Sequence, residues 1–122
     1  MTRDELIAEL EAATDGSREL SDAVLRACGW YIAALADGKS TPSWRRPNSS
    51  YVPGARPDPT RSIYDALSLA SSRWELNEMF LAWGNADESA SIFPAIRAVL
   101  IALLKMRYSP AAAVTTHDLA HR

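Results

Sequence analysis

The sequence contains few of the features that assign a protein to a specialised class. It has one cysteine, Cys28, so the chain cannot form an internal disulfide bond. Its charges nearly balance at a net −2, which neither demands nor excludes a nucleic-acid or acidic partner. The opening residues MTRDELIAEL lack the apolar core of a signal peptide. We therefore expect a protein of the reducing cytoplasm.

Long apolar runs are also scarce. The most apolar stretch, SIFPAIRAVLIALLKMR at residues 91–107, is shorter than the roughly 20 apolar residues that span a membrane. Its apolar positions follow helical spacing almost all round, with Ser91 as a candidate cap and Pro94 in the first turn. The stretch predicts a helix buried on most sides, in the core or also against a partner subunit. Its internal charge, Arg97, is expected to meet a carboxylate or to reach solvent at an interface.

The length and composition fit one domain with a sizeable core, because 48% of the 122 residues are hydrophobic. We expect a compact domain over residues 1–108 that includes a long proline-rich loop over residues 39–59. A tail follows over residues 109–122, where Pro110 precedes a run of alanines.

Capping signals predict two helices at the start of the chain. Thr2 followed by Glu5 forms a capping box, and the first helix should end near residues 15–16. Ser17 then caps a second helix, whose apolar positions recur at intervals of three and four residues as far as a stop at Gly38.

The proline-rich loop interrupts this helical pattern. Its five prolines, with asparagine, serines and glycine between them, exclude a helix and most strand pairing. Trp44 and Tyr51 are too apolar for a solvated linker, so we expect them to attach the loop to the core. Short extended pieces fit on either side of them.

The second half of the chain begins with a helix that Thr60 caps and that ends at residues 71–72. The alternation over residues 74–83 then predicts two short strands turning near residues 77–78, although many residues there also favour a helix. The expected fold class is α+β, with about four helices around a buried C-terminal helix and a small antiparallel hairpin or sheet. An all-α fold is the alternative.

Three segments, taken together, resemble a known family. DELIAELEAATDGSREL at residues 4–20, TRSIYDALSLA at residues 60–70 followed by Trp74, and IFPAIRAVLIALLKMR at residues 92–107 are similar in order and spacing to the phage ABA-sandwich domain family. Its members are small proteins of tailed phages, prophages and gene-transfer elements. The resemblance implies a phage origin and a mixed helix-and-sheet fold, and it carries over no active site.

Two short motifs suggest chemistry that their surroundings do not support. Gly38, Lys39 and Ser40 match the end of a phosphate-binding loop, but the first glycine of that motif is missing and Pro42 obstructs the following helix. His117 and His121 have a zinc-ligand spacing without a third ligand, at the end of the chain. We therefore predict no cofactor and no metal site.

Positive charge is concentrated in the proline-rich loop and just beyond it. Five cations against Asp58 give this region +4, which leaves −6 for the rest of the chain. Arginines interleaved with aromatics can bind single-stranded nucleic acid, or they can pair with acidic helix faces while the aromatics join the core. The candidate binding residues are Lys39, Trp44, Arg45, Arg46, Tyr51, Arg56 and Arg61.

No residue pattern in the chain indicates catalysis. Cys28 lies on the apolar face of its helix, which predicts a buried thiol rather than a nucleophile. We expect a non-enzymatic phage or prophage accessory protein that binds a host protein or protein complex, for example an anti-CRISPR-like inhibitor of a defence system. The alternatives are an assembly component that forms a homo-oligomer through the C-terminal helix, and a module that binds a small ligand or nucleic acid.

Overall fold

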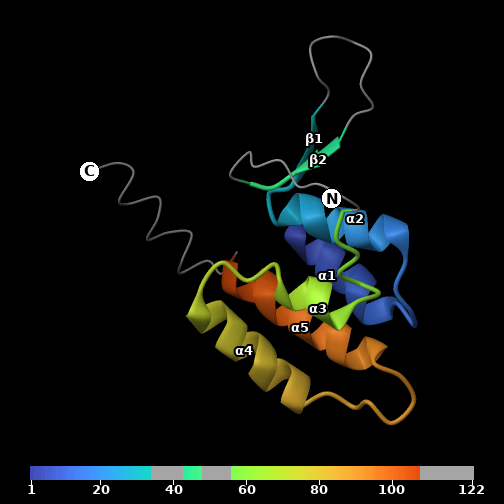
Figure 1. The fold of residues 1–122 in the computed structure, drawn as a ribbon. Coiled ribbons are helices and arrows are strands. Elements are labelled where there is room, and N and C mark those ends of the chain that lie inside the picture. Colours follow the sequence, from blue (N-terminus) through green and yellow to red (C-terminus); the bar gives the residue numbers. More distant parts are fainter. Residues whose placement is uncertain (34–42, 48–55, 108–122) are drawn as a thin grey trace.

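The computed structural model describes residues 1–33, 43–47 and 56–107. Within these residues, five helices and one two-stranded antiparallel sheet form an α+β fold, which confirms the predicted class (Figure 1). The elements are α1 (Arg3–Ala12), α2 (Arg18–Ala27), β1 (Tyr31–Ala33), β2 (Ser43–Arg45), α3 (Ile63–Leu67), α4 (Arg73–Gly84) and α5 (Phe93–Arg107).

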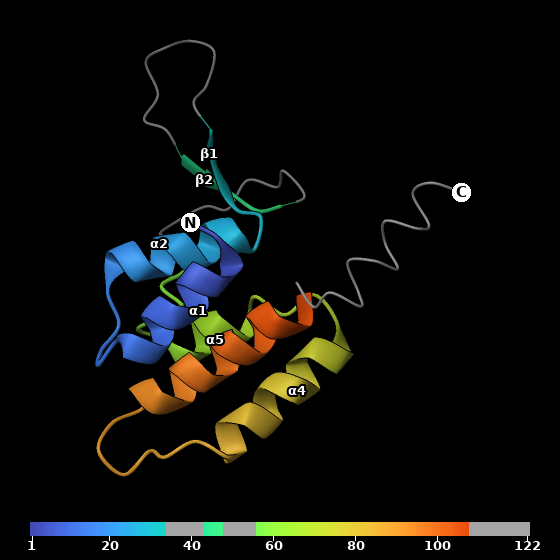
Figure 2. The same cartoon turned by 180° about the vertical axis from the view of Figure 1, so that it is seen from behind.

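Helix α5 lies at the centre of the described part of the protein. The helices α1, α3 and α4 all contact it, and seen from behind it lies between α1 and α4 (Figure 2). Val99, Leu100, Leu103 and Leu104 are fully buried along its length. The sequence prediction of a helix buried on most sides is therefore confirmed, with Pro94 in the first turn.

The start of α5 differs in one detail from the prediction. The helix begins at Phe93, so Ser91 precedes the cap position by one residue, and its hydroxyl accepts a long 3.4 Å hydrogen bond from the Phe93 N–H. The carbonyl of Ile92 accepts the first helical bonds, from the N–H groups of Ala95 and Ile96. Ser91 is therefore not the N-cap residue.

Among the described residues, Arg97 contacts backbone carbonyls rather than the carboxylate that was one of its two expected environments, and its side chain is partly exposed to solvent. Its guanidinium donates to the carbonyl of Ala13 at 3.0 Å and to that of Glu11 at 3.4 Å, at the end of α1. It also lies 5.6 Å from the ring centroid of Phe93. Because the last carbonyls of a helix have no partner within it, a cation there satisfies them and favours the helix dipole. Arg97 thus joins α5 to the C-terminal end of α1.

The two N-terminal helices begin where the sequence predicts. The Thr2 hydroxyl accepts from the Glu5 N–H at 3.1 Å, and the Ser17 hydroxyl accepts from the Leu20 N–H at 3.1 Å. Each bond satisfies one of the N–H groups that the first turn leaves unpaired. The first helix ends at Ala12, three residues before the predicted stop.

The second helix is much shorter than predicted, because Gly29 ends it. Gly29 has a φ of 92°, and its N–H donates to the carbonyl of Arg26 at 3.0 Å. The Trp30 N–H donates to the carbonyl of Leu25 at 2.9 Å. These two bonds around a left-handed glycine make a Schellman motif, with Trp30 and Leu25 as its apolar pair. The chain therefore leaves α2 before reaching the predicted stop at Gly38, and enters β1 instead.

The sheet lies elsewhere than predicted. Strand β1 pairs with β2 in the register Tyr31 with Arg45 and Ile32 with Trp44. Strand β1 therefore lies in the stretch predicted as the second helix, and β2 lies in the proline-rich loop. The predicted strand pair over residues 74–83 is wrong, because this stretch is the helix α4. Ser72 accepts from the Glu75 N–H at 3.1 Å and fixes its start.

Thr60 does not cap α3, and the helix ends at Leu67 rather than at residues 71–72. Ser62 is the N-cap residue, while Thr60 is buried against α2. The Thr60 hydroxyl donates to the Ser17 carbonyl at 2.9 Å, and its N–H donates to the Ser21 hydroxyl at 3.0 Å. At Gly16 a side chain would lie 2.0 Å from the Thr60 carbonyl oxygen. This close approach holds the segment before α3 against α2 and requires glycine.

Candidate functional site

The structure describes five of the seven residues predicted to bind through the basic loop. Lys39 and Tyr51 lie outside the described residues. The other five lie in β2, directly after it, or in the segment that leads into α3: Trp44, Arg45, Arg46, Arg56 and Arg61. Whether they bind a macromolecule stays a prediction, but their contacts within the protein can be described.

Trp44 forms a cluster with two arginines. The guanidinium carbons of Arg26 and Arg56 each lie 5.5 Å from the centroid of its ring, within the range of a cation–π contact. Trp44 is half-buried and packs against the apolar core. As predicted, it attaches this part of the chain to the core.

Asp22 of α2 binds two arginines from different parts of the chain. Arg56 donates to both of its oxygens, at 2.9 and 3.2 Å, and Arg18 donates to one at 3.0 Å. Burial acts to raise the pKa of Asp22, but the hydrogen bonds from Arg56 and Arg18 outweigh it, and the pKa is lowered. The carboxylate is thus held in its charged form.

Arg61 also has an acidic neighbour, since its Nε lies 3.3 Å from Asp58. Asp58 in turn accepts a hydrogen bond from the Ser21 hydroxyl at 2.5 Å. Arg56 and Arg61 therefore pair with acidic side chains, which is the alternative that the sequence left open beside nucleic-acid binding. Arg46 is exposed, and the described residues place no carboxylate within ion-pair distance of it.

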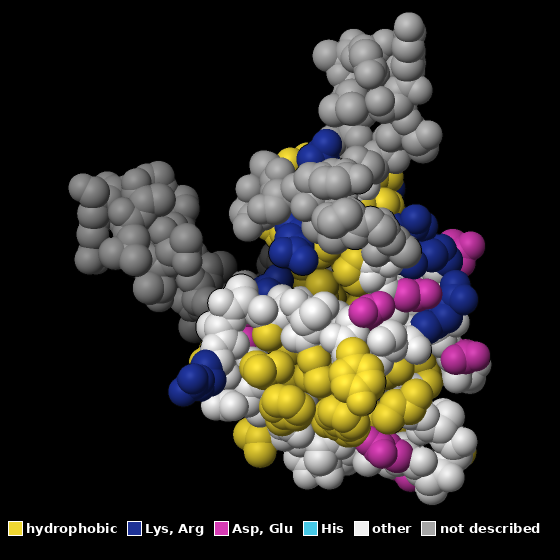
Figure 3. Space-filling model, in the orientation of Figure 1, with side chains coloured by type: hydrophobic (Ala, Val, Ile, Leu, Met, Phe, Trp, Pro, Cys, Tyr) yellow, Lys and Arg dark blue, Asp and Glu magenta, His cyan; other side chains and the backbone are white. Residues whose placement is uncertain are grey.

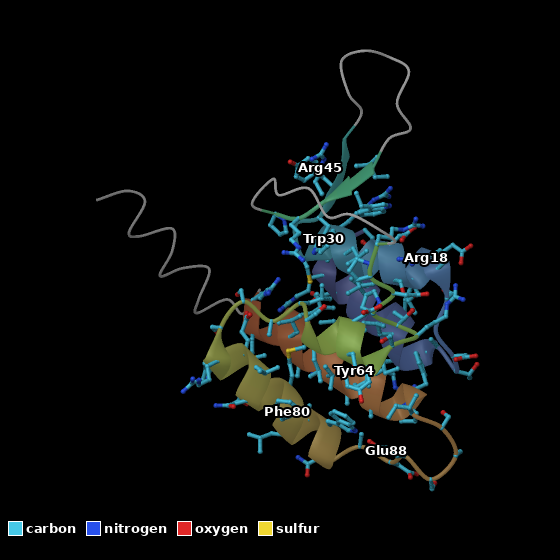
Figure 4. All side chains as sticks on the ribbon, viewed as in Figure 1. Arg18, Trp30, Arg45, Tyr64, Phe80 and Glu88 are labelled. Carbon is cyan, nitrogen blue, oxygen red and sulfur yellow. The ribbon has the colours of Figure 1, made fainter. Side chains whose placement is uncertain are left out.

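A cavity of about 800 Å³ opens where the end of α2, the residues after β2, residues 56–57, α3 with the residues after it, and the end of α5 meet. Its apolar wall includes Cys28, Trp30 and Leu69, which are 7 to 9% exposed. Figure 4 shows Trp30 between the strands and α3. The sequence did not indicate this cavity, because its walls come from five separate segments: 28–30, 46–47, 56–57, 65–71 and Arg107.

Three arginines line the same cavity. Arg46 and Arg56 are among the residues predicted to bind, and Arg107 at the end of α5 joins them. The sequence analysis did not select Arg107, because nothing in the local pattern places it beside the loop. Asp65 is the acidic residue of the lining, so the formal charge of the lining is +2.

Arg107 is fixed by a buried ion pair with Glu75 of α4. Its Nε and Nη2 donate to the two Glu75 oxygens at 3.0 and 3.2 Å, and Nη2 also donates to the Leu69 carbonyl at 2.5 Å. Burial acts to raise the pKa of Glu75, but hydrogen bonds from Arg107 and Ser71 lower it overall. The pair holds the guanidinium at the cavity wall and joins α5 to α4.

Cys28 is a free thiol at the end of α2. It is buried, as predicted, and burial raises the pKa of its thiol from 9.0 to about 11. Because the thiolate is the nucleophile, the raised pKa is expected to slow the reactions of this thiol at neutral pH.

A second feature is an apolar surface on α3 and α4. It consists of four large side chains that are 47 to 79% exposed: Tyr64, Trp74, Phe80 and Leu81. Figure 3 shows hydrophobic side chains gathered over these two helices. We call these four residues the α3–α4 apolar surface. The sequence missed it, because residues 74–83 were assigned to strands.

The edge of this surface is also aromatic. The rings of Phe80 and Trp83 stack with centroids 6.2 Å apart, and the Trp83 indole N–H donates to the carboxylate of Glu88. Phe80, Trp83, Gly84 and Glu88 line a shallow hollow of about 450 Å³. Helix α4 thus has apolar contacts available on its solvent side as well as on its core side.

Two remaining predictions lie outside the described residues. Lys39 and Ser40, which resemble the end of a phosphate-binding loop, and His117 with His121 are not described. In the ranges that the structure does cover, no three metal-ligating side chains come together, and no helix is long and apolar enough to cross a membrane.

Comparisons of the chain with protein families, with curated proteins and with solved structures found no match. The resemblance to the phage ABA-sandwich family therefore stays a prediction.

Proposed function

We propose that the protein is a non-enzymatic accessory protein of phage or prophage origin that binds a host protein in the bacterial cytoplasm. The α3–α4 apolar surface is the binding surface. The phage origin rests on the sequence resemblance alone. The exposure of these four side chains, together with the hydrophobic side chains gathered over α3 and α4 in Figure 3, carries the proposal, because an extended exposed apolar patch marks an interaction site.

The area of the surface is in the range that an interface requires. Aromatic side chains present about 150–250 Å² each, so the four side chains expose on the order of 500 Å². A stable interface buries about 800 Å² per partner, and the hollow beside Phe80 and Trp83 extends the contact toward that value. Trp and Tyr are also the residue types that contribute most to binding energy in protein interfaces.

The chemistry of the partner follows from the charges on α4. On the solvent side of α4, Asn77, Phe80, Leu81 and Gly84 carry no formal charge, whereas the exposed Arg73 and the half-buried Glu78 do. Beside Phe80 and Leu81, a charged partner surface would lose its hydration without gaining an ion pair. The partner surface is therefore apolar where it meets Phe80 and Leu81, and it can carry charges where it meets Arg73 and Glu78.

Plaque formation tests this proposal. The protein is expressed in hosts with defined defence systems, and we expect it to restore phage growth against at least one of them. Trp74→Ser combined with Leu81→Ser should abolish the rescue, because both side chains are exposed and contribute to the surface. Ile32→Ser in β1, which removes an exposed apolar side chain elsewhere, is the matched control and should retain it.

Two results would contradict the proposal. One is full rescue by the double variant, and the other is absence of rescue in every system. Circular dichroism of each variant establishes that the loss of rescue is not a loss of folding.

A second candidate is a homo-oligomer formed through the same surface, since an uncharged apolar face can pair with its own copy. Light scattering separates the two candidates. A dimer in the wild-type protein that the double variant converts to a monomer would favour self-assembly, whereas a monomer at all concentrations supports binding of a host protein.

A further inference from the structure

The cavity between the strands and α3 has the size and chemistry of a ligand site. Its volume of about 800 Å³ falls within the range of about 300–1,000 Å³ that small-molecule sites occupy. It is separate from the α3–α4 apolar surface, with which it shares none of its lining residues.

The walls divide into an apolar part and a cationic part. Trp30 and Leu69 are at most 9% exposed and form a rigid apolar wall. Arg46, Arg56 and Arg107 form the cationic part of the wall. In Figure 3, dark-blue side chains border a hollow above α3. An apolar wall with a few convergent polar groups is the usual composition of a ligand site.

The three arginines have different roles. Arg56 and Arg107 are fixed by Asp22 and Glu75, so these ion pairs hold two guanidinium groups in place without movement of the chain. Arg46 is exposed, and the structure shows no ion pair for it among the residues it describes. Arg46 can therefore bind an anion by releasing only its bound water, without breaking an ion pair within the protein.

We propose that this cavity binds a small organic anion. Its flat apolar body lies against Trp30 and Leu69, and its carboxylate or phosphate pairs with Arg46. An uncharged apolar molecule could contact Trp30 and Leu69, but it would form no ion pair with Arg46.

The test is a titration of the ¹⁵N-labelled protein with two anions and their neutral counterparts. Indole-3-acetate is compared with indole-3-ethanol, and adenosine monophosphate is compared with adenosine. We expect at least one anion to bind with a dissociation constant below about 1 mM and at least tenfold more tightly than its counterpart. The resonances that shift should include the Trp30 indole and the amides of Leu69 and Ser71. Whichever anion binds identifies the head group as carboxylate or phosphate.

Variants separate this site from non-specific attraction. Arg46→Gln should weaken the anion at least tenfold, while Arg73→Gln, an exposed arginine at the start of α4, should leave its affinity unchanged. Because Arg46 is exposed and has no structural pair among the described residues, its variant should fold as the wild type does.

Three outcomes overturn the proposal. They are failure of both anions to bind, equal binding of a neutral counterpart, and wild-type affinity in the Arg46→Gln protein. The rescue of phage growth does not enter into this test, so the two proposals stand or fall separately.

Discussion

At the scale of single residues, Cys28 shows how position sets chemistry. The same side chain near the surface would be a reactive thiol, but between α2 and the cavity wall it is 7% exposed. The positive charge of Arg107 acts to lower its pKa, and burial outweighs that effect. The result is a thiol that stays protonated through the physiological range.

We predict that Cys28 reacts slowly with iodoacetamide. With a pKa of about 11 instead of 9.0, the thiolate fraction at pH 8 is about a hundredfold smaller than in the unfolded chain. The rate should rise about tenfold per pH unit between pH 8 and 10. Mass spectrometry of the single alkylated site measures the rate, and the protein in denaturant is the control. Equal rates in the folded and unfolded chains at pH 8 would contradict the prediction.

The sequence patterns around Gly16 and Gly29 differ in whether they predict the end of a helix. Gly16 lies in the predicted break between the first two helices. Gly29 is surrounded by apolar residues at helical spacing, so periodicity continues across it and suggests a longer helix. In the structure Gly29 faces Pro47, whose side-chain carbons would lie 3.2 Å from a Cβ at this position. The contact with Pro47 is distant in sequence, so no local rule could have found it.

At the scale of elements, α4 shows how apolar residues on the solvent side of a helix can make its sequence resemble that of a strand. Its large apolar residues lie on the solvent side as well as the core side, so the periodicity of a helix is blurred and alternation resembles a strand. A local signal was nevertheless present, because Ser72 and Glu75 have the spacing of a capping box. Ser72 accepts the Glu75 N–H, while the Glu75 carboxylate accepts from Ser71 and Arg107.

Glu75 gives α4 a pH-dependent link to α5. The unfolded carboxyl titrates near 4.5, and the pKa in the folded protein is lower. A lowered pKa contributes stability above the unfolded value, and that stability is lost as the pH falls below about 4.5 through the folded value. The ion pair with Arg107 should therefore weaken in acid.

We predict that Glu75→Gln lowers the free energy of unfolding by about 3 kcal/mol at pH 7, because it leaves Arg107 without its buried counter-ion. The variant should also lose less stability than the wild type between pH 5 and 3. Urea denaturation at each pH measures both effects. Glu78→Gln on the same helix is the control and should change stability by less than about 0.5 kcal/mol. A loss as small as that of the control would show that the ion pair contributes little.

At the scale of the whole molecule, the apolar residues divide between an internal helix and an external surface. Helix α5 is enclosed by its neighbours, as its apolar pattern predicts, and α4 carries large apolar side chains that are exposed. The alternative of a homo-oligomer through α5 therefore has less exposed apolar surface to draw on than one through α4.

This division predicts different losses of stability when a leucine of α5 and a leucine of α4 are each replaced by alanine. Leu100→Ala in α5 should lower the free energy of unfolding by about 2–5 kcal/mol, because Leu100 is fully buried and leaves a cavity. Leu81→Ala in α4 should change it by less than about 0.5 kcal/mol, because Leu81 is 61% exposed. Thermal and urea denaturation measure both. Similar costs for the two variants would mean that Leu81 is covered in solution, as it would be in a dimer.

The candidate sites were only partly predictable. Sequence reasoning selected Arg46 and Arg56 from charge and aromatic content. It assigned them to a loop surface rather than to a cavity, and it did not connect them with Trp30 or Arg107. Those residues come together through contacts such as Arg107 with Leu69, 38 positions apart, and Arg56 with Asp22, 34 positions apart.

The sequence by itself determined where α1 and α2 begin and that residues 93–107 form the buried helix. These features depend on hydrogen bonds within three residues and on the spacing of apolar side chains, both of which are local. Only the tertiary structure decided how β1 and β2 pair, which face of α4 meets solvent and which arginines line the cavity. Each of these depends on segments distant in sequence whose contacts compete with local preference, and the outcome of that competition is fixed only when the chain folds around α5.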